Sequence, residues 1–139
     1  MEIKVFSSLP EAAKRIREQV FIEEQGFTVE FDDKDEIAIH LVLFAEDGTP
    51  VATCRIFKDS DKDTYVIGRI AVIKAYRGKK LGSVLLTEAE RYVKEKGGKC
   101  IELLAQQRVT AFYKKCGFTE FGEVEYDEGC PHIRMKKYI

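Results

Sequence analysis

Residues 71–90, AVIKAYRGKKLGSVLLTEAE, change character halfway along, and this change decides the fold expected for the chain. They begin as a β-rich apolar run, pass through a basic turn with two glycines, and end with apolar residues at helical spacing. The turn places Arg77, Lys79 and Lys80 at the mouth of that helix, where unpaired backbone N–H groups are already electropositive. The sequence therefore predicts that an anion binds at this turn.

The neighbouring residues place the turn inside a strand–helix–strand unit. Residues 64–73, TYVIGRIAVI, are expected as a strand, and residues 83–96 as a helix that Gly97 and Gly98 stop. Residues 99–105, KCIELLA, form a nearly continuous apolar run, which is typical of a buried parallel strand. The pattern predicts a βαβ unit with two parallel strands.

The remaining elements predict antiparallel pairing around this unit. Residues 37–57 form two apolar runs around Asp47–Gly48, a strong hairpin signal, and residues 9–24 have helical spacing up to Gly26. Residues 27–36 are expected as an acidic loop. Further expected elements are a first strand near residues 3–5, a helix over 109–116, and a hairpin of strands 118–124 and 132–137. The expected fold class is α/β (α+β): one domain, residues 1–139, with a mixed, mostly antiparallel sheet, one parallel crossover and flanking helices.

Composition narrows the classes of function. The chain has 139 residues, and Lys+Arg 23 against Asp+Glu 24 give a net charge of −1, which disfavours nonspecific binding of nucleic acid. No apolar run approaches the length of about 18 residues that a membrane span requires, and the first 15 residues lack a signal-peptide pattern. Four cysteines without a CxxC pair and two histidines do not suggest a metal site. We therefore expect a cytoplasmic protein with reduced thiols, no metal and no membrane partner.

The basic turn suits a diphosphate, although two familiar nucleotide motifs are absent. Gly82 is followed by Ser83, so the pattern G-x-x-x-x-G-K-[ST] does not occur, and neither does G-x-G-x-x-G. A P-loop ATPase and a Rossmann dehydrogenase are therefore disfavoured. An exposed basic turn, with glycines that serve only the chain reversal, stays open as the alternative at this point.

Residues 67–86, IGRIAVIKAYRGKKLGSVLL, resemble motif A of the GNAT acetyltransferases, whose signature is [QR]-x-x-G-x-[GA]. Arg77 and Gly82 match that signature, whereas Lys80 stands where the family has its first glycine. Residues 105–118, AQQRVTAFYKKCGF, resemble motif B of the same family. Residues 16–27, IREQVFIEEQGF, are similar to the ElaA-like group, and residues 122–137 are similar both to that group and to glyphosate N-acetyltransferase.

The resemblance implies acetyl-CoA as the cofactor. Its diphosphate would lie on the backbone amides of Gly78–Gly82, and its pantetheine would pair with Ile70, Ala71 and Val72 along an exposed strand edge. The edge would be exposed by the splaying of this strand from its parallel neighbour at 100–105. The full set of residues that the resemblance assigns to the cofactor is Ile70, Ala71, Val72, Arg77, Gly78, Lys79, Lys80, Leu81, Gly82, Ser83, Gln106 and Tyr113.

Transfer to an amine requires a base, oxyanion stabilisation and a proton for the departing thiolate. Many GNAT enzymes use a glutamate on the strand before motif A, but residues 66–72, VIGRIAV, contain no carboxylate. His132 is the best candidate base, because imidazole titrates near neutral pH and the resemblance to glyphosate N-acetyltransferase implies the same role. Tyr113 resembles the family's general acid, with Phe112 expected as the packed neighbour. A structural role for each residue is the alternative.

Other polar residues are weaker candidates. Cys130 lies two residues from His132, and the corresponding Cα separation of about 6.5 Å makes a thiol–imidazole pair unfavourable. His40, in an apolar strand, is expected to be a satisfied core residue. Arg17, Arg55 and Arg69 could bind an acidic group on the acceptor, since arginine pairs with carboxylates and phosphates, although each taken singly is expected to be structural.

The function expected from the sequence is N-acetyl transfer from acetyl-CoA to a small-molecule amine, by direct attack in a ternary complex. Two alternatives stay open. One is a noncatalytic acyl-CoA-binding or regulatory domain, which Lys80 and the missing strand carboxylate favour. The other is acetylation of protein or peptide amines, for which the acidic residues 29–36 offer weak support, since they could equally form a solvated loop. A homodimer is a candidate assembly.

Overall fold

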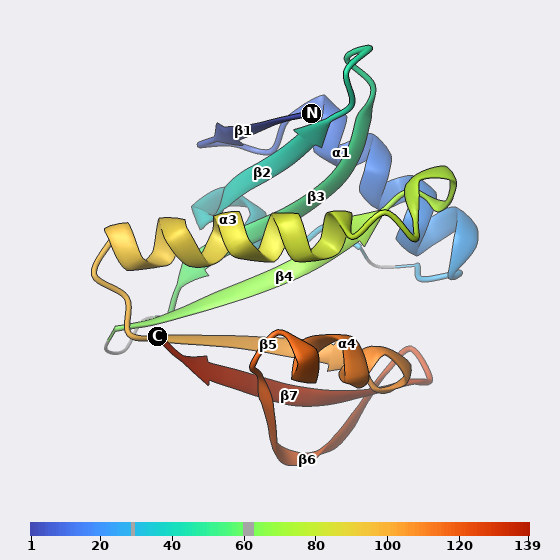
Figure 1. The fold of residues 1–139 in the computed structure, drawn as a ribbon. Helices are drawn as coiled ribbons and strands as arrows, with labels where there is room; N and C mark the ends of the chain where they lie inside the picture. The colour runs from blue at the N-terminus through green and yellow to red at the C-terminus, as the bar shows by residue number, and fades with distance from the viewer. Residues whose placement is uncertain (29, 60–62) are drawn as a thin grey trace. The chain divides into compact units, whose positions relative to one another are not determined.

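The computed structural model describes residues 1–28, 30–59 and 63–139 (Figure 1). The chain divides into two compact parts, one with residues 1–57 and 67–89, the other with residues 58–66 and 90–139. Strand β4 (Thr64–Val72) and helix α3 (Leu81–Glu95) contribute residues to both. The expectation that residues 1–139 form one domain stays a prediction, and each part is described by itself.

The first part contains the antiparallel strands β1 (Glu2–Phe6), β2 (Ile39–Phe44) and β3 (Pro50–Lys58), with the later residues of β4. The β1–β2 and β2–β3 ladders are antiparallel, with Leu41 paired both with Val5 and with Cys54. The predicted turn is confirmed: Ala45 N donates to Thr49 O at 2.8 Å, and Gly48 has φ +87°. The two apolar runs that the sequence shows are buried along nearly their whole length in β2 and β3.

The helix predicted over residues 9–24 has two parts. Pro10 has an extended backbone (φ −82°, ψ 157°), so α1 begins after it and covers Glu11–Arg17. A π-helix, Glu18–Glu24, follows, in which backbone bonds span five residues, as in the bond from Gln25 N to Val20 O. Gly26, with φ +81°, ends the segment as predicted.

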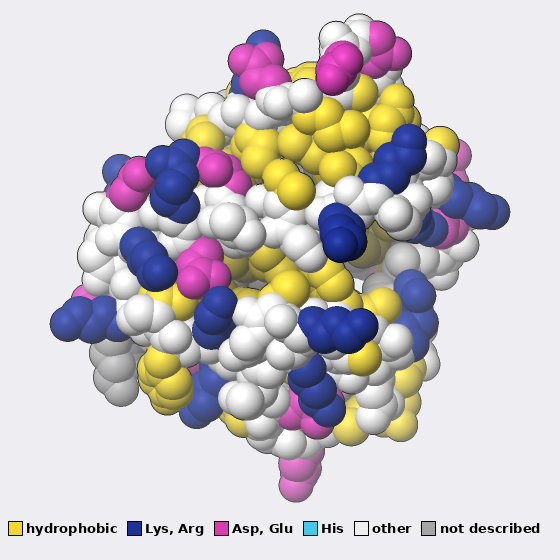
Figure 2. All heavy atoms as spheres, viewed as in Figure 1, with side chains coloured by type: hydrophobic (Ala, Val, Ile, Leu, Met, Phe, Trp, Pro, Cys, Tyr) yellow, Lys and Arg dark blue, Asp and Glu magenta, His cyan; other side chains and the backbone are white. Residues whose placement is uncertain are grey.

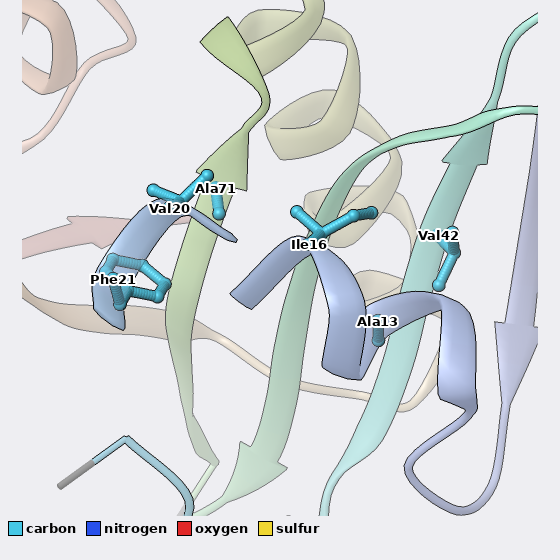
Figure 3. Close-up of a cluster of buried hydrophobic side chains, with 6 residues drawn as sticks. All are labelled: Ala13, Ile16, Val20, Phe21, Val42 and Ala71. Atoms are coloured by element: carbon cyan, nitrogen blue, oxygen red, sulfur yellow. The ribbon is translucent and has the colours of Figure 1, made fainter. Parts of the chain in front are cut away.

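The helical segment covers one face of the sheet in this part. Figure 3 shows side chains from positions 13–21 gathered against Val42 of β2 and Ala71 of β4. Ala13, Ile16 and Val20 are at most 3% exposed, and their spacing gives the apolar stripe of an amphipathic helix. This packing fixes the helical segment beside the later residues of β4, where the sequence places the cofactor edge.

Residues 27–36 are not wholly a loop. A short helix, α2 (Lys34–Ile37), occupies the end of this acidic stretch and leaves Asp35 buried. The expected solvated loop is therefore wrong at two positions, since Glu30 is also only 5% exposed. Burial of two carboxylates requires partners, which are described with the candidate site.

The second part contains the predicted parallel pair. Residues 64–66 of β4 run parallel to β5 (Cys100–Gln106), which pairs antiparallel with β7 (Cys130–Tyr138). The one-turn helix η3 (Gln107–Val109) and α4 (Thr110–Lys115) follow β5. Among the described residues, the hydrogen-bonded strand order is β1-β2-β3-β4-β5-β7-β6. The predicted fold class, a mixed sheet with one parallel crossover and flanking helices, is confirmed.

The C-terminal hairpin is longer than predicted. Strand β6 covers Thr119–Asp127 instead of 118–124, and β7 exceeds the predicted 132–137 at both ends. The β6–β7 register shifts between Phe121 and Glu125, where Gly122 has φ +76°. Nearly every residue of β6 is exposed, and the strand ends the strand order. An exposed bulge of this kind is typical of an edge strand.

On the face drawn in Figure 2, Lys and Arg side chains are interspersed with Asp and Glu instead of forming one continuous basic patch. No helix within the described part of the chain is long and apolar enough to cross a membrane.

Gly98 ends α3 in a crowded position, and we predict that Gly98→Ala destabilises the protein. Gly98 N donates to Val93 O at 2.9 Å, while a Cβ on Gly98 would lie 2.4 Å from Val93 Cγ1 and 2.7 Å from Tyr65 Cδ1. Relief of such overpacking requires side-chain shifts, so we expect a loss of about 1–3 kcal/mol in the free energy of unfolding, measured by urea denaturation. Gly68→Ala is the control, since its Cβ would meet only Arg55 Nε, at 3.8 Å. Equal stability of the two variants would contradict the prediction.

Candidate functional site

The predicted anion-binding turn follows β4 and lies wholly in the first part of the chain. After the one-turn helix η2 (Lys74–Tyr76), the backbone enters the left-handed region at Gly78 (φ +81°) and at Lys80 (φ +61°), and α3 begins at Leu81. Val84 N makes the first backbone bond of α3, to Lys80 O at 3.2 Å. The amides of residues 81–83 therefore have no partner within the helix, and its first turn carries no acidic residue. This donor set suits a phosphate group.

Lys80 has the left-handed backbone that glycine adopts most easily, and this conformation explains why the family signature has a glycine at position 80. Its φ of +61° is unusual for a residue with a Cβ. Gly82, at the second glycine position of the signature, has helical backbone inside α3. The departure at position 80 therefore leaves the path of the turn intact and adds local strain of roughly 1 kcal/mol.

The three cationic side chains of the turn differ in how far they are free to meet an anion. Arg77 donates to Glu24, with NH2 at 2.7 Å from Oε1, and its Nε donates to Val72 O at 2.9 Å. The hydrogen bonds that Glu24 accepts from Arg77 raise the pKa of Arg77. Lys79 Nζ lies 5.0 Å from the centre of the Tyr76 ring, within cation–π distance, and both Lys79 and Lys80 are exposed.

The strand edge predicted for pantetheine begins where parallel pairing ends. The β4–β5 ladder covers Thr64–Val66, and Ile70–Val72 lie beyond it. Between them Arg69 has φ +52°, an irregularity that redirects its side chain toward the acidic stretch. Ala71 is buried in the apolar cluster, while Ile70 and Val72 are half-buried.

His132 lies in the second part, in β7, and is 7% exposed. Its Nδ1 is 2.8 Å from the carbonyl oxygen of Cys130. Because a carbonyl can only accept, Nδ1 carries the proton, and the basic nitrogen of the neutral ring is Nε2. The ring thus bonds the backbone carbonyl of Cys130, and the expectation that the Cys130 thiol takes no part in the chemistry stays a prediction. Its Cα is paired with Gln106 of β5, a residue that the resemblance assigns to the cofactor.

Tyr113 also lies in the second part, in α4, and is 8% exposed. Its ring contacts Phe118 edge-on at 6.1 Å between centroids and Phe112 at 5.0 Å. Phe112 packs against Tyr113 as expected, but it is half-buried, and Tyr113 is the more buried of the two. The short helix turns position 113 toward the aromatic cluster, and the general-acid role of Tyr113 stays a prediction.

The three arginines predicted for the acceptor meet in the first part, around the acidic stretch. Arg17 donates from Nε to Glu30 Oε2 at 2.9 Å and from NH1 to Asp35 Oδ1 at 2.7 Å. Arg55 shares Asp35 at 3.0 Å. Arg69 Nε lies 3.1 Å from Glu30 Oε2, and Asp32 accepts from both Arg55 and Arg69. We call these six residues, Arg17, Glu30, Asp32, Asp35, Arg55 and Arg69, the arginine–carboxylate network.

The network pairs three arginines with three carboxylates, so its charges balance within the fold. This agrees with the structural role that the sequence predicts for each arginine taken singly. Binding of an acceptor by these arginines stays a prediction. The sequence contains one signal for the network: Arg17 falls on the apolar stripe of α1, between Ile16 and Val20. A charge on a buried stripe requires a partner, but spacing alone does not identify it.

Burial and pairing shift the titration of the network in opposite directions. Hydrogen bonds and charge from Arg17, with further donors, outweigh burial and lower the pKa of Asp35 to about 2. Burial raises the pKa of Glu30 despite its arginine partners. Burial also lowers the pKa of His40, whose Nε2 lies 3.1 Å from Asp35 O and therefore carries the proton that it donates. His40 is 1% exposed, which confirms that it is a satisfied core residue.

A model of the acetyltransferase (GNAT) family matches residues 6–118. The chain belongs to the GNAT family. It is 33% identical to the protein ElaA of Escherichia coli over 133 residues, which cover 92% of this chain and 86% of ElaA. The crystal structure of that ElaA has a TM-score of 0.87 and 31% identity, with 98% of each chain covered. The membership in an ElaA-like group is thereby confirmed, whereas the similarity to glyphosate N-acetyltransferase stays a prediction.

Other solved structures share the GNAT fold. An acyl-CoA N-acyltransferase from Pseudomonas aeruginosa has a TM-score of 0.87 and 26% identity, with 98% of each chain covered. An aminoglycoside 6'-N-acetyltransferase complexed with coenzyme A has a TM-score of 0.76, covers 99% of this chain and 96% of its own, and is 16% identical. At the latter identity the likeness concerns the fold alone. Family and neighbours together support acyl transfer as the class of activity.

The network makes stability depend on pH in acid, and we predict that Asp35→Asn removes part of this dependence. The pKa of Asp35 falls from 3.8 unfolded to about 2 folded, so its ionised form contributes about 2 kcal/mol, present above pH 4 and lost as the pH falls toward 2. At pH 7 the variant leaves buried Arg17 short of a partner and costs about 3 kcal/mol. Urea denaturation at several pH values should show the gap between wild type and variant narrowing below pH 4. Asp33→Asn, at an exposed neighbour, is the control, and a constant gap for Asp35→Asn would contradict the prediction.

The strain at position 80 predicts that Lys80→Gly stabilises the turn. Glycine adopts the left-handed backbone without the steric cost of roughly 1 kcal/mol, and the added freedom of the unfolded chain offsets about half of this gain or more, so we expect a net stabilisation of up to about 0.5 kcal/mol. Lys79→Gly removes the same charge at a position without positive φ, so it should lower stability by a similar amount. Thermal and urea unfolding measure both, and a loss of stability in Lys80→Gly equal to that in Lys79→Gly would show that the turn is not strained.

Proposed function

We propose that this chain transfers an acetyl group from acetyl-CoA to the amine of a small-molecule acceptor, by direct attack in a ternary complex. The observation that carries the proposal is the turn before α3, where left-handed backbone at Gly78 and Lys80 precedes the amides of the first helical turn, which have no partner within the helix. In a member of the GNAT family, this donor set supports a diphosphate as the anion. An aminoglycoside acetyltransferase of the same fold is complexed with coenzyme A, and coenzyme A is accordingly the ligand with which the proposal is tested.

The residues of the turn and of β4 fit the two ends of the cofactor. The amides of residues 78–83 and the exposed ammonium groups of Lys79 and Lys80 match a diphosphate in charge and in hydrogen bonding. The backbone of Ile70–Val72 offers edge donors and acceptors for the amides of pantetheine, because it lies beyond the β4–β5 ladder. Acetyl-CoA supplies an activated thioester carbonyl.

His132 and Tyr113 are proposed to move the two protons of the reaction. His132 accepts the proton of the acceptor's ammonium group at Nε2, because Nδ1 already carries a proton that bonds Cys130 O. The neutral amine then forms its bond to the acetyl carbon as the carbon–sulfur bond breaks. Tyr113 donates its hydroxyl proton to the departing thiolate. The attacking nitrogen loses its second proton as the amide forms, and this proton returns through water to the Tyr113 phenolate. This assignment accounts for transfer without the strand carboxylate that residues 66–72 lack.

A domain that binds acyl-CoA without transfer is the competing function, and the missing carboxylate favours it. Coenzyme A release, followed with a thiol reagent, should be measured with acetyl-CoA and a panel of amino acids, amino sugars, polyamines, aminophosphonates and peptides. We expect binding of coenzyme A and release with at least one small amine. Binding without release across the panel would favour the noncatalytic function, and absence of binding would contradict both. Release with peptides alone would favour a peptide acetyltransferase.

If His132 and Tyr113 have the proposed roles, two variants should lose turnover while they still bind coenzyme A. His132→Asn keeps a side-chain donor for Cys130 O but removes the base, and Tyr113→Phe keeps the packed ring but removes the acid. Each should lower kcat by about 100-fold or more, with the affinity for coenzyme A unchanged within twofold. Tyr126→Phe, at a residue 73% exposed, is the matched control and should retain full activity. If both site variants turn over as fast as this control, the roles are assigned wrongly.

A further inference from the structure

A pair of side chains in the first part connects the turn to the helical segment that precedes the acidic stretch. Glu24, the last residue of the π-helix, accepts from both terminal nitrogens of Arg77, at 2.5 and 2.7 Å. Arg77 Nε donates to Val72 O at 2.9 Å. One guanidinium thus joins three segments: the end of the π-helix, the end of β4, and the turn itself. We call these contacts the Glu24–Arg77 clasp.

The geometry of the clasp is suited to positioning more than to stability. Both side chains are partly exposed, 40% for Arg77 and 35% for Glu24, and exposed ion pairs add little to the stability of a fold. A planar guanidinium that donates to both carboxylate oxygens nevertheless fixes distance and direction, because two parallel bonds allow a single arrangement. The two residues are 53 positions apart, so the clasp restrains the turn against a distant segment.

The π-helix supplies a second, independent observation. Its five-residue bonds are rare and less favourable than those of an α-helix, and such segments often occur at functional sites. The wider winding begins at Glu18 and ends on Glu24, and it changes the direction in which position 24 faces. The π-helix is an unfavourable geometry, and it ends at Glu24, the partner of Arg77. This indicates that the direction of the Glu24 carboxylate matters for its contact with Arg77.

The clasp also changes the part that Arg77 plays in the turn. Its charge is matched by Glu24, and its Nε points back to the last residue of β4. The cations left for an anion are Lys79 and Lys80, both exposed, with the amides at the start of α3. On this inference Arg77 supports the turn, whereas the resemblance implies that Arg77 binds the diphosphate directly.

We propose that Glu24 is a positioning residue for the cofactor turn: through Arg77 it holds the turn in the conformation that receives the diphosphate, and Arg77 acts as a brace. This inference rests on the proposed function, because it requires coenzyme A to bind at residues 78–83. Without the clasp, the turn and the end of β4 become more mobile, and ligand binding has to order them. The expected effect is weaker binding of coenzyme A with little change in the transfer step.

The test compares Glu24→Ala, Arg77→Ala and their double variant with Glu23→Ala, which removes the same charge from the neighbouring exposed position. Isothermal titration calorimetry with coenzyme A should show affinity lowered about fivefold in each single variant and no further in the double variant, since both remove one interaction. Glu23→Ala should bind as the wild type does. With acetyl-CoA, KM should rise by a similar factor while kcat stays within twofold. Glu24→Gln, which keeps the side chain's size and one acceptor, should give an intermediate affinity.

Different outcomes separate this inference from the function on which it rests. Tighter binding in Glu24→Ala would overturn the inference, because it would show that Glu24 competes with the diphosphate for Arg77. Affinity equal to that of Glu23→Ala, or additive losses in the double variant, would overturn it as well. In each of these cases the wild type still binds coenzyme A, and the proposed function stands. Failure of the wild type to bind coenzyme A would overturn both.

Discussion

The buried guanidinium of Arg17 is the constraint on which the first part of the structure depends. It is 1% exposed, and a charge removed from water in this way is tolerated only with close, hydrogen-bonded partners. Glu30 and Asp35 provide them, so the acidic stretch must fold back over α1. Asp35 in turn engages Arg55 of β3, and Glu30 engages Arg69 of β4. One buried charge thus ties a helix, an irregular segment and two strands together.

This constraint reaches the candidate cofactor edge through Arg69. The side chain of Arg69 can meet Glu30 because its backbone is left-handed within β4, an arrangement that costs energy for a residue with a Cβ. The irregularity follows the last paired residue of the β4–β5 ladder, Val66, and precedes Ile70–Val72. The network and the strand edge are therefore linked through one residue, so a change in the acidic stretch can alter the edge without contact to any ligand.

Local signals in the sequence were sufficient for much of the fold. The turn at Asp47–Gly48, the helix end at Gly97 and the parallel strands around α3 all follow from turn chemistry and apolar spacing over fewer than about 15 residues. The π-helix and α2 could not be found in this way. α2 accompanies the burial of Asp35, whose partner Arg17 is distant in sequence. The π-helix keeps the apolar spacing of a helix and differs in its backbone bonds, which spacing does not reveal.

In the candidate site, too, local sequence predicted the backbone of the turn, whereas contacts between distant segments were not predictable. Position 78 and the start of α3 were expected from the motif, and Lys80 shows that a departure in residue type need not change the backbone path. The partner of Arg77 was not foreseeable, because Glu24 is 53 residues away and is one of several carboxylates in its segment. Nor did spacing show that position 113, and not 112, turns toward Phe118.

The outermost strand, β6, has a consequence for self-association. A strand at the end of a sheet offers unpaired backbone groups to other chains, and proteins protect such edges with charges and bulges. β6 carries four carboxylates, Glu120, Glu123, Glu125 and Asp127, together with the register shift after Phe121. Two copies joined along this strand would bring like charges to a spacing of about 4.8 Å across a ladder that is already interrupted. Growth of the sheet from one molecule into the next is thereby disfavoured at neutral pH, although Glu120 and Glu125 are paired with Lys114 and Arg134 within the chain.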